Sequence, residues 1–174
     1  MATALWKRLD MFGHDAAVLT ERDGEMALEG VSLFEADATV SVIYQLRVTH
    51  RNEVLARIDG TVGPHPFRHE IRRDAKGWTM DGRSLGLGHL RHLTFGFTPA
   101  TSALLYRRER LTGGRTISGV HFNIGEPRLT EWPQHFRRRD RGLYDYRSPR
   151  RETCLRIESD GFIQTDPGIW QREA

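Results

Sequence analysis

Hydrophobic residues recur at every second position in this chain, and this period of two constrains the fold more than any other feature. The longest such run places Val40, Val42, Tyr44, Leu46 and Val48 on one side of an extended segment. Because successive side chains of a β-strand point to opposite faces, the alternation predicts a strand with one face buried in a core.

Shorter runs repeat this pattern over residues 54–58, 67–71, 93–97, 120–124, 144–146 and 155–157. Residue pairs that favour turns separate the runs: Asp23-Gly24, Asp59-Gly60, Gly63-Pro64, Lys76-Gly77, Asp81-Gly82, Gly113-Gly114 and Asp160-Gly161. Short strands joined by frequent turns are typical of an antiparallel sheet, a sandwich or a barrel. We therefore expect an all-β chain that forms a single domain over residues 1–174.

Helices have little place in this pattern. No segment sustains the apolar period of about 3.6 residues that a helix with one buried face requires. The best candidates for one or two short helices are Ala4–Met11 and the stretch around Gln134–Arg141. Long connections are expected near residues 84–92 and 126–142, where they would cross the open mouth or the edge of the sheet.

The composition is typical of an intracellular protein. The single cysteine, Cys154, lies in an alternating apolar run, which favours a small buried side chain over a reactive thiol. The chain lacks both the apolar core of about 7–15 residues that a signal peptide needs and the apolar run of about 20 residues that spans a membrane. We therefore expect a cytoplasmic protein without membrane insertion. Whether it is a monomer or a homodimer is left open.

Neither a metal site nor a catalytic motif stands out. On one face of a strand, His65 and His69 would lie about 13 Å apart, too far to share one metal ion. His89 and His92 would point to opposite faces of an extended segment. The serines lack the glycine-rich elbow of hydrolases, and the glycines of residues 82–88 lack the lysine of a phosphate-binding loop. We expect no metal, no cofactor and no enzymatic activity.

The densest positive charge lies in residues 137–141, where arginines flank Asp140. Phe136, Tyr144 and Tyr146 are close in sequence, and basic groups interleaved with aromatic ones can hold single-stranded nucleic acid. The net charge of the chain is only +3, however, and an acid interrupts the run. A solvated charged loop is the preferred interpretation, and nucleic acid is not expected as a partner.

The segment Phe97–Arg108, of sequence FTPATSALLYRR, carries a family resemblance. It resembles the signature phenylalanine-threonine-proline-x-threonine-asparagine-x-leucine-proline-x-arginine-arginine of the bacterial putative glycolipid-binding family. Gln134-His135-Phe136 and Tyr144-Asp145-Tyr146 are similar to that family's glutamine-x-tyrosine and tyrosine-x-tyrosine pairs. The resemblance extends to Tyr44, Trp78, Asp160-Gly161-Phe162-Ile163, Pro167-Gly168 and Arg172.

The chain also departs from the family pattern. His92 and Thr94 stand in place of an aspartate-x-aspartate motif, Ser102 in place of the asparagine, Leu105 in place of the second proline, and Asp166 in place of a tyrosine. A member that differs at these positions can keep the fold and bind another ligand.

The resemblance implies a curved antiparallel sheet with a concave apolar face. It would form either a half-open barrel, similar to that of periplasmic lipoprotein carriers, or a barrel-like sandwich of two sheets. The residues implied for ligand binding are Tyr44, Thr98, Thr101, Arg107, Arg108, Gln134, Tyr144 and Tyr146. Arg107 and Arg108 would point to opposite faces of an extended segment, so that one of them could meet an anionic head group.

These observations favour a non-catalytic binding protein for an amphipathic ligand, lipid-like or glycolipid-like, held on the concave face of the sheet. One alternative is an enzyme that acts on a small molecule in the same cavity, with His92, Glu25 or Tyr144 as acid or base. Another is an interaction module that uses the arginine cluster of residues 137–141.

Overall fold

The computed structural model describes residues 1–109, 111 and 114–173. In this part of the chain the strands are β1 (Ala2–Arg8), β2 (Gly13–Arg22), β3 (Glu25–Glu35), β4 (Thr39–Val48), β5 (Val54–Val62), β6 (His65–Asp74), β7 (Gly77–Met80), β8 (Arg83–Ser84), β9 (Leu93–Phe95), β10 (Gly114–Asn123), β11 (Glu126–Asp140), β12 (Leu143–Ser148), β13 (Arg151–Ile157), β14 (Ile163–Asp166) and β15 (Trp170–Glu173). The described helix is α1 (Ser102–Glu109).

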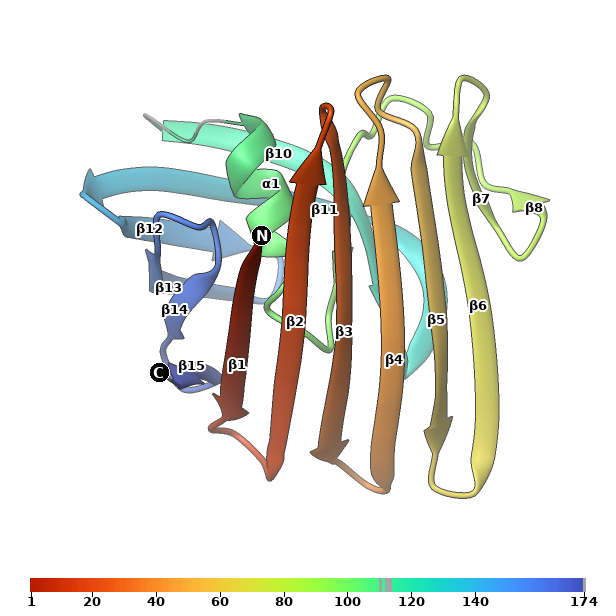
Figure 1. Cartoon of the computed structure of the whole chain (residues 1–174), viewed down its shortest axis with the longest axis horizontal. Helices are drawn as coiled ribbons and strands as arrows, with labels where there is room; N and C mark the ends of the chain where they lie inside the picture. The colour runs from red at the N-terminus through yellow and green to blue at the C-terminus, as the bar shows by residue number, and fades with distance from the viewer. Residues whose placement is uncertain (110, 112–113, 174) are drawn as a thin grey trace.

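All the described strands belong to one sheet, in the order β8-β7-β6-β5-β4-β3-β2-β1-β15-β14-β13-β12-β11-β10-β9. Neighbours are antiparallel except β9 and β10, which run parallel. The first and last strands of the chain, β1 and β15, pair with each other and join the two halves of the sheet. The sheet curves so strongly that β10 and β11 cross behind the upright strands, while β12 and β13 lie to the left of β1, with α1 between the two layers (Figure 1). The curved sheet stays open, with β8 and β9 at its edges.

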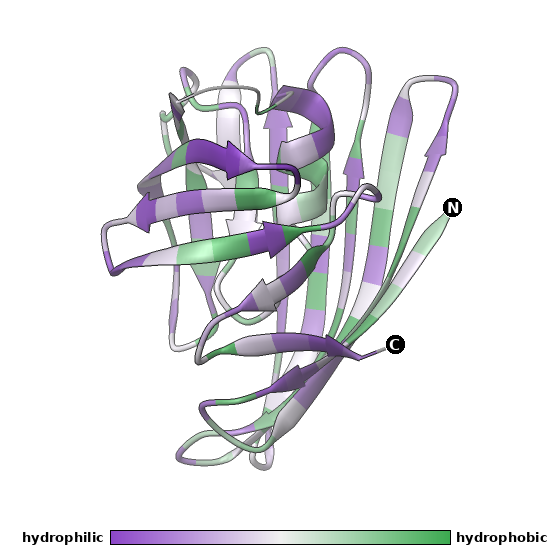
Figure 2. Cartoon of the chain, turned by 90° about the vertical axis from the view of Figure 1, so that its left-hand side faces the viewer, coloured by the Kyte–Doolittle hydropathy of each residue, from purple (hydrophilic) through white to green (hydrophobic). Residues whose placement is uncertain are grey.

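The period of two predicted this architecture correctly in the N-terminal half. β4 runs from Thr39 to Val48, and its alternating apolar side chains are buried as expected. Alternation of apolar and polar residues is visible along the upright strands in Figure 2, where one side of each strand faces the second layer. The all-β class and the curved antiparallel sheet implied by the resemblance are therefore confirmed.

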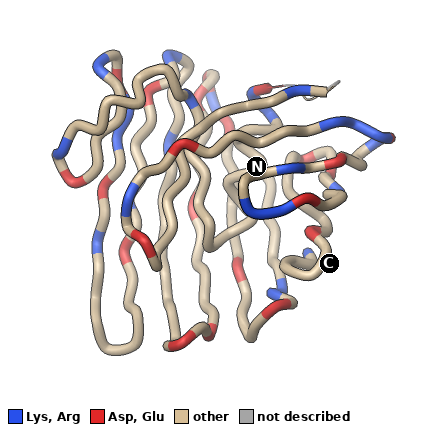
Figure 3. Tube along the Cα trace, turned by 180° about the vertical axis from the view of Figure 1, so that it is seen from behind, with Lys and Arg blue, Asp and Glu red and all other residues tan. Residues whose placement is uncertain are grey.

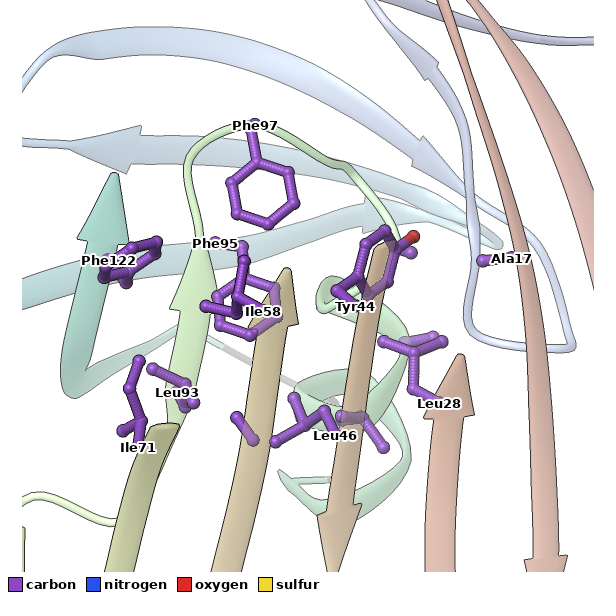
Figure 4. Close-up of a cluster of buried hydrophobic side chains, with 14 of the residues drawn as sticks. Ala17, Leu28, Tyr44, Leu46, Ile58, Ile71, Leu93, Phe95, Phe97 and Phe122 are labelled. Atoms are coloured by element: carbon purple, nitrogen blue, oxygen red, sulfur yellow. The ribbon is translucent and has the colours of Figure 1, made fainter. Parts of the chain in front are cut away.

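The main core fills the space between the two layers. Side chains of β4 and β5, among them Leu46 and Ile58, point toward Phe95, Phe97 and Phe122 of the opposite layer (Figure 4). The rings of Phe95 and Phe97 stack with their centroids 5.1 Å apart. Each such side chain contributes about 1.5–3 kcal/mol when it leaves water, so this contact holds the layers together.

A second, smaller core lies between α1 and the C-terminal strands. Leu105 of α1 packs there with Phe136, Tyr144 and Leu155. The helix follows a turn in which the Ser102 hydroxyl donates to the Pro99 carbonyl oxygen at 2.6 Å. α1 thus fills the gap that the curved sheet leaves on its concave side.

Both helix positions predicted from the sequence were wrong, because the two segments form strands. Residues Ala2–Arg8 form β1, in which Ala4 and Trp6 are buried while their neighbours are exposed. Trp6 donates its indole N–H to the Ile163 carbonyl oxygen at 2.7 Å, a contact that a helix of this segment would lose. The stretch around Gln134–Arg141 belongs largely to β11, where Gln134 and Phe136 alternate as buried residues.

Other local predictions were also wrong. The connection expected at 126–142 is mostly the long strand β11, whereas residues 85–92 do form a connection between β8 and β9. Asp59-Gly60 is not a turn but lies within β5, where a Cβ on Gly60 would meet the Phe67 ring at 2.8 Å. Gly113 of the expected Gly113-Gly114 turn lies outside the described residues. Cys154 is half-buried rather than buried.

The Tyr44 ring occupies the space that a side chain on Gly30 of β3 would fill. The two residues are paired in the β3–β4 register, and a Cβ on Gly30 would lie 2.3 Å from both Cζ and the hydroxyl oxygen of Tyr44. We expect Gly30→Ala to destabilise the protein by about 1–3 kcal/mol, because the ring must leave its place in a packed core. Urea unfolding measures this difference.

Gly125→Ala is the matched control, since a Cβ there has nothing within 4 Å. It should change the free energy of unfolding by less than about 0.5 kcal/mol. Equal losses in the two variants would contradict this account of Gly30.

Candidate functional site

Four of the residues implied for ligand binding line one cleft: Thr98, Thr101, Gln134 and Tyr146. The cleft has a volume of about 580 Å³. Its walls come from β10–β13, from the segment that leads from β9 into α1, and from residues 166–170. The structure therefore brings together, in one concave site, residues that are far apart in the sequence.

The cleft contains a flat aromatic surface. The rings of His121 on β10 and Trp132 on β11 stack with centroids 4.4 Å apart and an interplanar angle of 18°. Burial, and secondly the nearby Arg150, lowers the pKa of His121 to about 4. The imidazole is therefore neutral near pH 7, and its Nδ1 lies 3.1 Å from the Thr94 hydroxyl. A neutral stacked pair of this kind suits the apolar face of a ligand.

A buried amide adjoins this surface. Gln134 is only 7% exposed, and its Oε1 accepts a hydrogen bond from the Tyr146 hydroxyl at 3.2 Å. Among the described residues its Nε2 has no hydrogen-bond partner. Leaving a buried donor unsatisfied costs about 1–3 kcal/mol. Nε2 is itself closed to solvent, so a small side-chain movement at the cleft would let a ligand acceptor reach and satisfy it.

An ion pair lies beside the cleft. Arg151 donates to the Asp166 carboxylate, and both residues contribute to the lining. Burial raises the pKa of Asp166, and the Arg151 guanidinium opposes that shift. Asp166 is a position at which the chain departs from the family pattern. Thr94 and Ser102, two other such positions, line the same cleft.

Tyr44 is not part of the cleft wall but lies behind it, fully buried. Its hydroxyl donates to Oδ1 of Asp15 at 2.9 Å and lies 3.1 Å from the Thr98 hydroxyl. Asp15 is likewise fully buried, and its Oδ2 has no partner among the described residues. Burial raises the pKa of Asp15 to about 7. Tyr44 thus positions Thr98 from behind.

The two arginines of the signature lie elsewhere, because they belong to α1 and not to an extended segment. Arg107 pairs with Glu21 at 2.9 Å and lines a second pocket together with Tyr144. Arg108 donates to the Asn52 side chain and borders a gap of only about 10 Å³. Neither reaches the first cleft. With Tyr44 behind the cleft, the residues implied for one site are divided among four places.

The acid–base residues considered for an enzyme are not gathered either. His92 pairs with Glu109 at 2.8 Å beside the small gap near Arg108, and burial lowers its pKa. Tyr144 lines the second pocket, and Glu25 lies at the start of β3. In the described part of the chain, no three His, Cys, Asp or Glu side chains form a group that could hold a metal ion.

Trp132, His121 and Asp15 were missed by reasoning from the sequence. Their neighbourhood depends on pairing between strands: Gly119 lies opposite Trp132 in the β10–β11 register, and His121 lies opposite Thr130. The one feature of the sequence that could have indicated this site is Trp132 itself, a large aromatic residue close to Gln134. The sequence does not show that its ring stacks on His121.

The fold and the cleft define an all-β protein with an open curved sheet and a concave ligand-sized site. The family described as "Putative glycolipid-binding" matches residues 3–172, and the chain belongs to that family. No curated protein matches the chain. A DUF1089 family protein from Pseudomonas aeruginosa, known from a crystal structure, is similar with a TM-score of 0.75 and 18% identity over 91% of this chain and 92% of that one. At this identity the similarity shows a common fold.

Within the described residues, no helix has the length and the apolar character that crossing a bilayer requires.

The raised pKa of Asp15 predicts a pH dependence of stability. Because its pKa rises from 3.8 to about 7 on folding, the native state favours the protonated carboxyl. The contribution of Asp15 to the free energy of unfolding is fully present below pH 4 and is lost as the pH rises through 7. Asp15→Asn should remove that loss, on the order of 3–4 kcal/mol, since one pKa unit corresponds to about 1.4 kcal/mol.

Urea unfolding at pH 4.5 and pH 8 tests this expectation. The variant should gain stability relative to the wild type between the two pH values. Asp37→Asn, at an exposed position between β3 and β4, is the control and should leave the pH profile unchanged. Parallel profiles for Asp15→Asn and the wild type would show that Asp15 is ionised in the folded protein.

Proposed function

We propose that the protein binds an amphipathic, glycolipid-like ligand in the cleft between α1 and β10–β13 and catalyses no reaction on it. The observation that carries this proposal is the buried Gln134 amide, whose Nε2 lacks a partner among the described residues, beside the stacked rings of Trp132 and His121. An apolar surface next to a few oriented polar groups is the usual composition of a small-molecule site.

A sugar head group fits this combination of contacts. One face of a pyranose ring carries C–H groups that can lie against the exposed part of the Trp132 ring, which His121 and Arg150 flank. The hydroxyls of the sugar both donate and accept hydrogen bonds. Gln134 offers a donor, while the hydroxyls of Thr98 and Tyr146 can act in either sense. The volume of about 580 Å³ lies within the range of known ligand pockets. The description of the family supports the same class of ligand.

A binding role is preferred to an enzymatic one because the half-buried titratable groups Asp166 and His121 are engaged, and the remaining carboxylate of the lining, Glu152, is exposed to solvent. Asp166 is paired with Arg151, and His121 is stacked with a pKa of about 4. A general base at neutral pH needs a proton-accepting group that is free to meet the substrate. We further propose that the protein acts in the cytoplasm, where a free thiol such as that of Cys154 stays reduced.

Titration with n-octyl-β-D-glucoside below its micellar concentration tests the proposal. Trp132 is the half-buried tryptophan of the cleft, whereas Trp6, Trp78 and Trp170 are buried, so binding should change its fluorescence. Gln134→Leu keeps the size of the side chain but removes the donor, and it should weaken binding by about tenfold. Gln45→Leu, on the exposed face of β4, is the matched control and should bind as the wild type does.

Native mass spectrometry of the freshly purified protein provides an independent measurement. A co-purifying amphiphile that is absent from the Gln134→Leu variant would support the cleft as its site. The proposal fails if the wild type neither retains an amphiphile nor responds to octyl glucoside, or if both glutamine variants lose binding equally.

A further inference from the structure

A second pocket, of about 640 Å³, lies beside the C-terminal half of α1 and the turn between β11 and β12. Four arginines and one acid are among its lining residues: Arg107, Arg138, Arg141, Arg156 and Glu158. This excess of positive charge distinguishes it from the first cleft.

The arginine cluster of residues 137–141 is divided by the alternation of β11. Arg137 and Arg139 both pair with the Asp145 carboxylate, whereas Arg138 lies opposite Tyr144 and lines the pocket. The cluster gathers at the outer end of β11, as Figure 3 shows. Two of its four arginines therefore share the single carboxylate of Asp145, and the other two, Arg138 and Arg141, adjoin the pocket.

The charge in the pocket is largely uncompensated. Arg107 is held by Glu21 and by the Asp160 carbonyl oxygen. The part of the chain that the structure describes places no carboxylate in ion-pair contact with Arg138, Arg141 or Arg156. Like charges that lie together repel, so an anion between them would be stabilised.

One hydroxyl adds a neutral donor. The Tyr144 hydroxyl donates to that of Tyr106 at 3.5 Å, which leaves the Tyr106 O–H to donate to a ligand, and both residues line the pocket. Burial, followed by the contact with Tyr106, raises the pKa of Tyr144 to about 12, so it keeps its proton at neutral pH.

The second pocket is separate from the first cleft. Ser102, at the start of α1, lines the cleft, whereas Tyr106 in the second half of the helix lines the pocket. Leu105 lies between them and packs on Phe136 and Tyr144 in the second core. An occupant of the pocket therefore contacts residues that a ligand of the cleft does not.

We propose that this pocket is a second binding site, for a phosphate or sulfate group, formed chiefly by Arg138 and Arg141. The planar guanidinium matches two oxygens of such a group at once, and the Tyr106 hydroxyl can donate to a third. The group can belong to a soluble phosphate ester or to the head of an anionic lipid. This site does not depend on the function proposed for the cleft.

Isothermal titration with inorganic phosphate and with glycerol 3-phosphate, at low ionic strength, tests the proposal. The double variant Arg138→Ala/Arg141→Ala should weaken binding by at least about tenfold, because two charge-assisted contacts are lost. The matched control Arg137→Ala/Arg139→Ala removes the same charge from the same arginine cluster and should change the affinity less than about twofold. Added salt should weaken binding by the wild type.

Sedimentation with vesicles identifies the source of the group. If phosphatidylglycerol vesicles bind the wild type but not the Arg138→Ala/Arg141→Ala variant, the group belongs to a lipid. Binding of glycerol 3-phosphate without sedimentation assigns the site to soluble esters. Phosphatidylcholine vesicles, which carry no net charge, should not bind.

Circular dichroism verifies that the variants are folded, and Arg141→Ala alone, at an exposed turn position, should give a partial loss of affinity. Octyl glucoside binding should persist in the Arg138→Ala/Arg141→Ala variant, which separates this test from that of the cleft. The proposal is overturned if the wild type binds neither phosphate nor anionic vesicles, or if the two double variants lose affinity equally.

Discussion

The buried hydroxyl of Tyr44 makes a polar contact between the first layer of the sheet and the segment that follows β9. It contacts Asp15 of the same layer and Thr98 of the segment that leads into α1. Close by, Ser32 donates to the Phe97 carbonyl oxygen at 3.1 Å. In an apolar interior such contacts are directional, whereas the stacked phenylalanines around them can slide. The network therefore sets the position of the segment after β9, and with it one wall of the cleft.

The hairpin of β10 and β11 is the second determinant of the site, because both of its faces are buried. Phe122 and its partner Leu129 pack into the main core, whereas Ile117 and Phe136 pack under α1 in the second core. A strand that alternates between two cores leaves no solvated face over part of its length. α1 is held on one of these faces, and a concave space remains at each end of the helix. The cleft and the basic pocket are those two spaces.

The sequence predicted much of this fold and little of its geometry. Alternation located β4 because one of its faces is buried throughout and the other is solvated. The same rule failed for β1, where the short run around Trp6 is compatible with a helix until Phe162 and Ile163 supply its partners. α1 was missed because its apolar residues, Ala103 to Leu105, are consecutive and do not follow a helical period. Contacts between residues that are distant in the sequence determine whether these segments become β1 and α1, and no local sequence pattern encodes such contacts.

The predictions for the candidate site were also correct for some residues and wrong for others. Thr98, Gln134 and Tyr146 were found through the family resemblance and do meet in one cleft, whereas Arg107 and Arg108 diverge because consecutive residues on a helix point about 100° apart. Three of the five departures from the family pattern, Thr94, Ser102 and Asp166, line the cleft, whereas His92 and Leu105 border the small gap near Arg108. Replacing a tyrosine by Asp166 introduces an acid that must be balanced, and Arg151 balances it. The fold itself is shared with a protein only 18% identical, so the scaffold tolerates extensive change in sequence, and differences at the cleft need not disturb it.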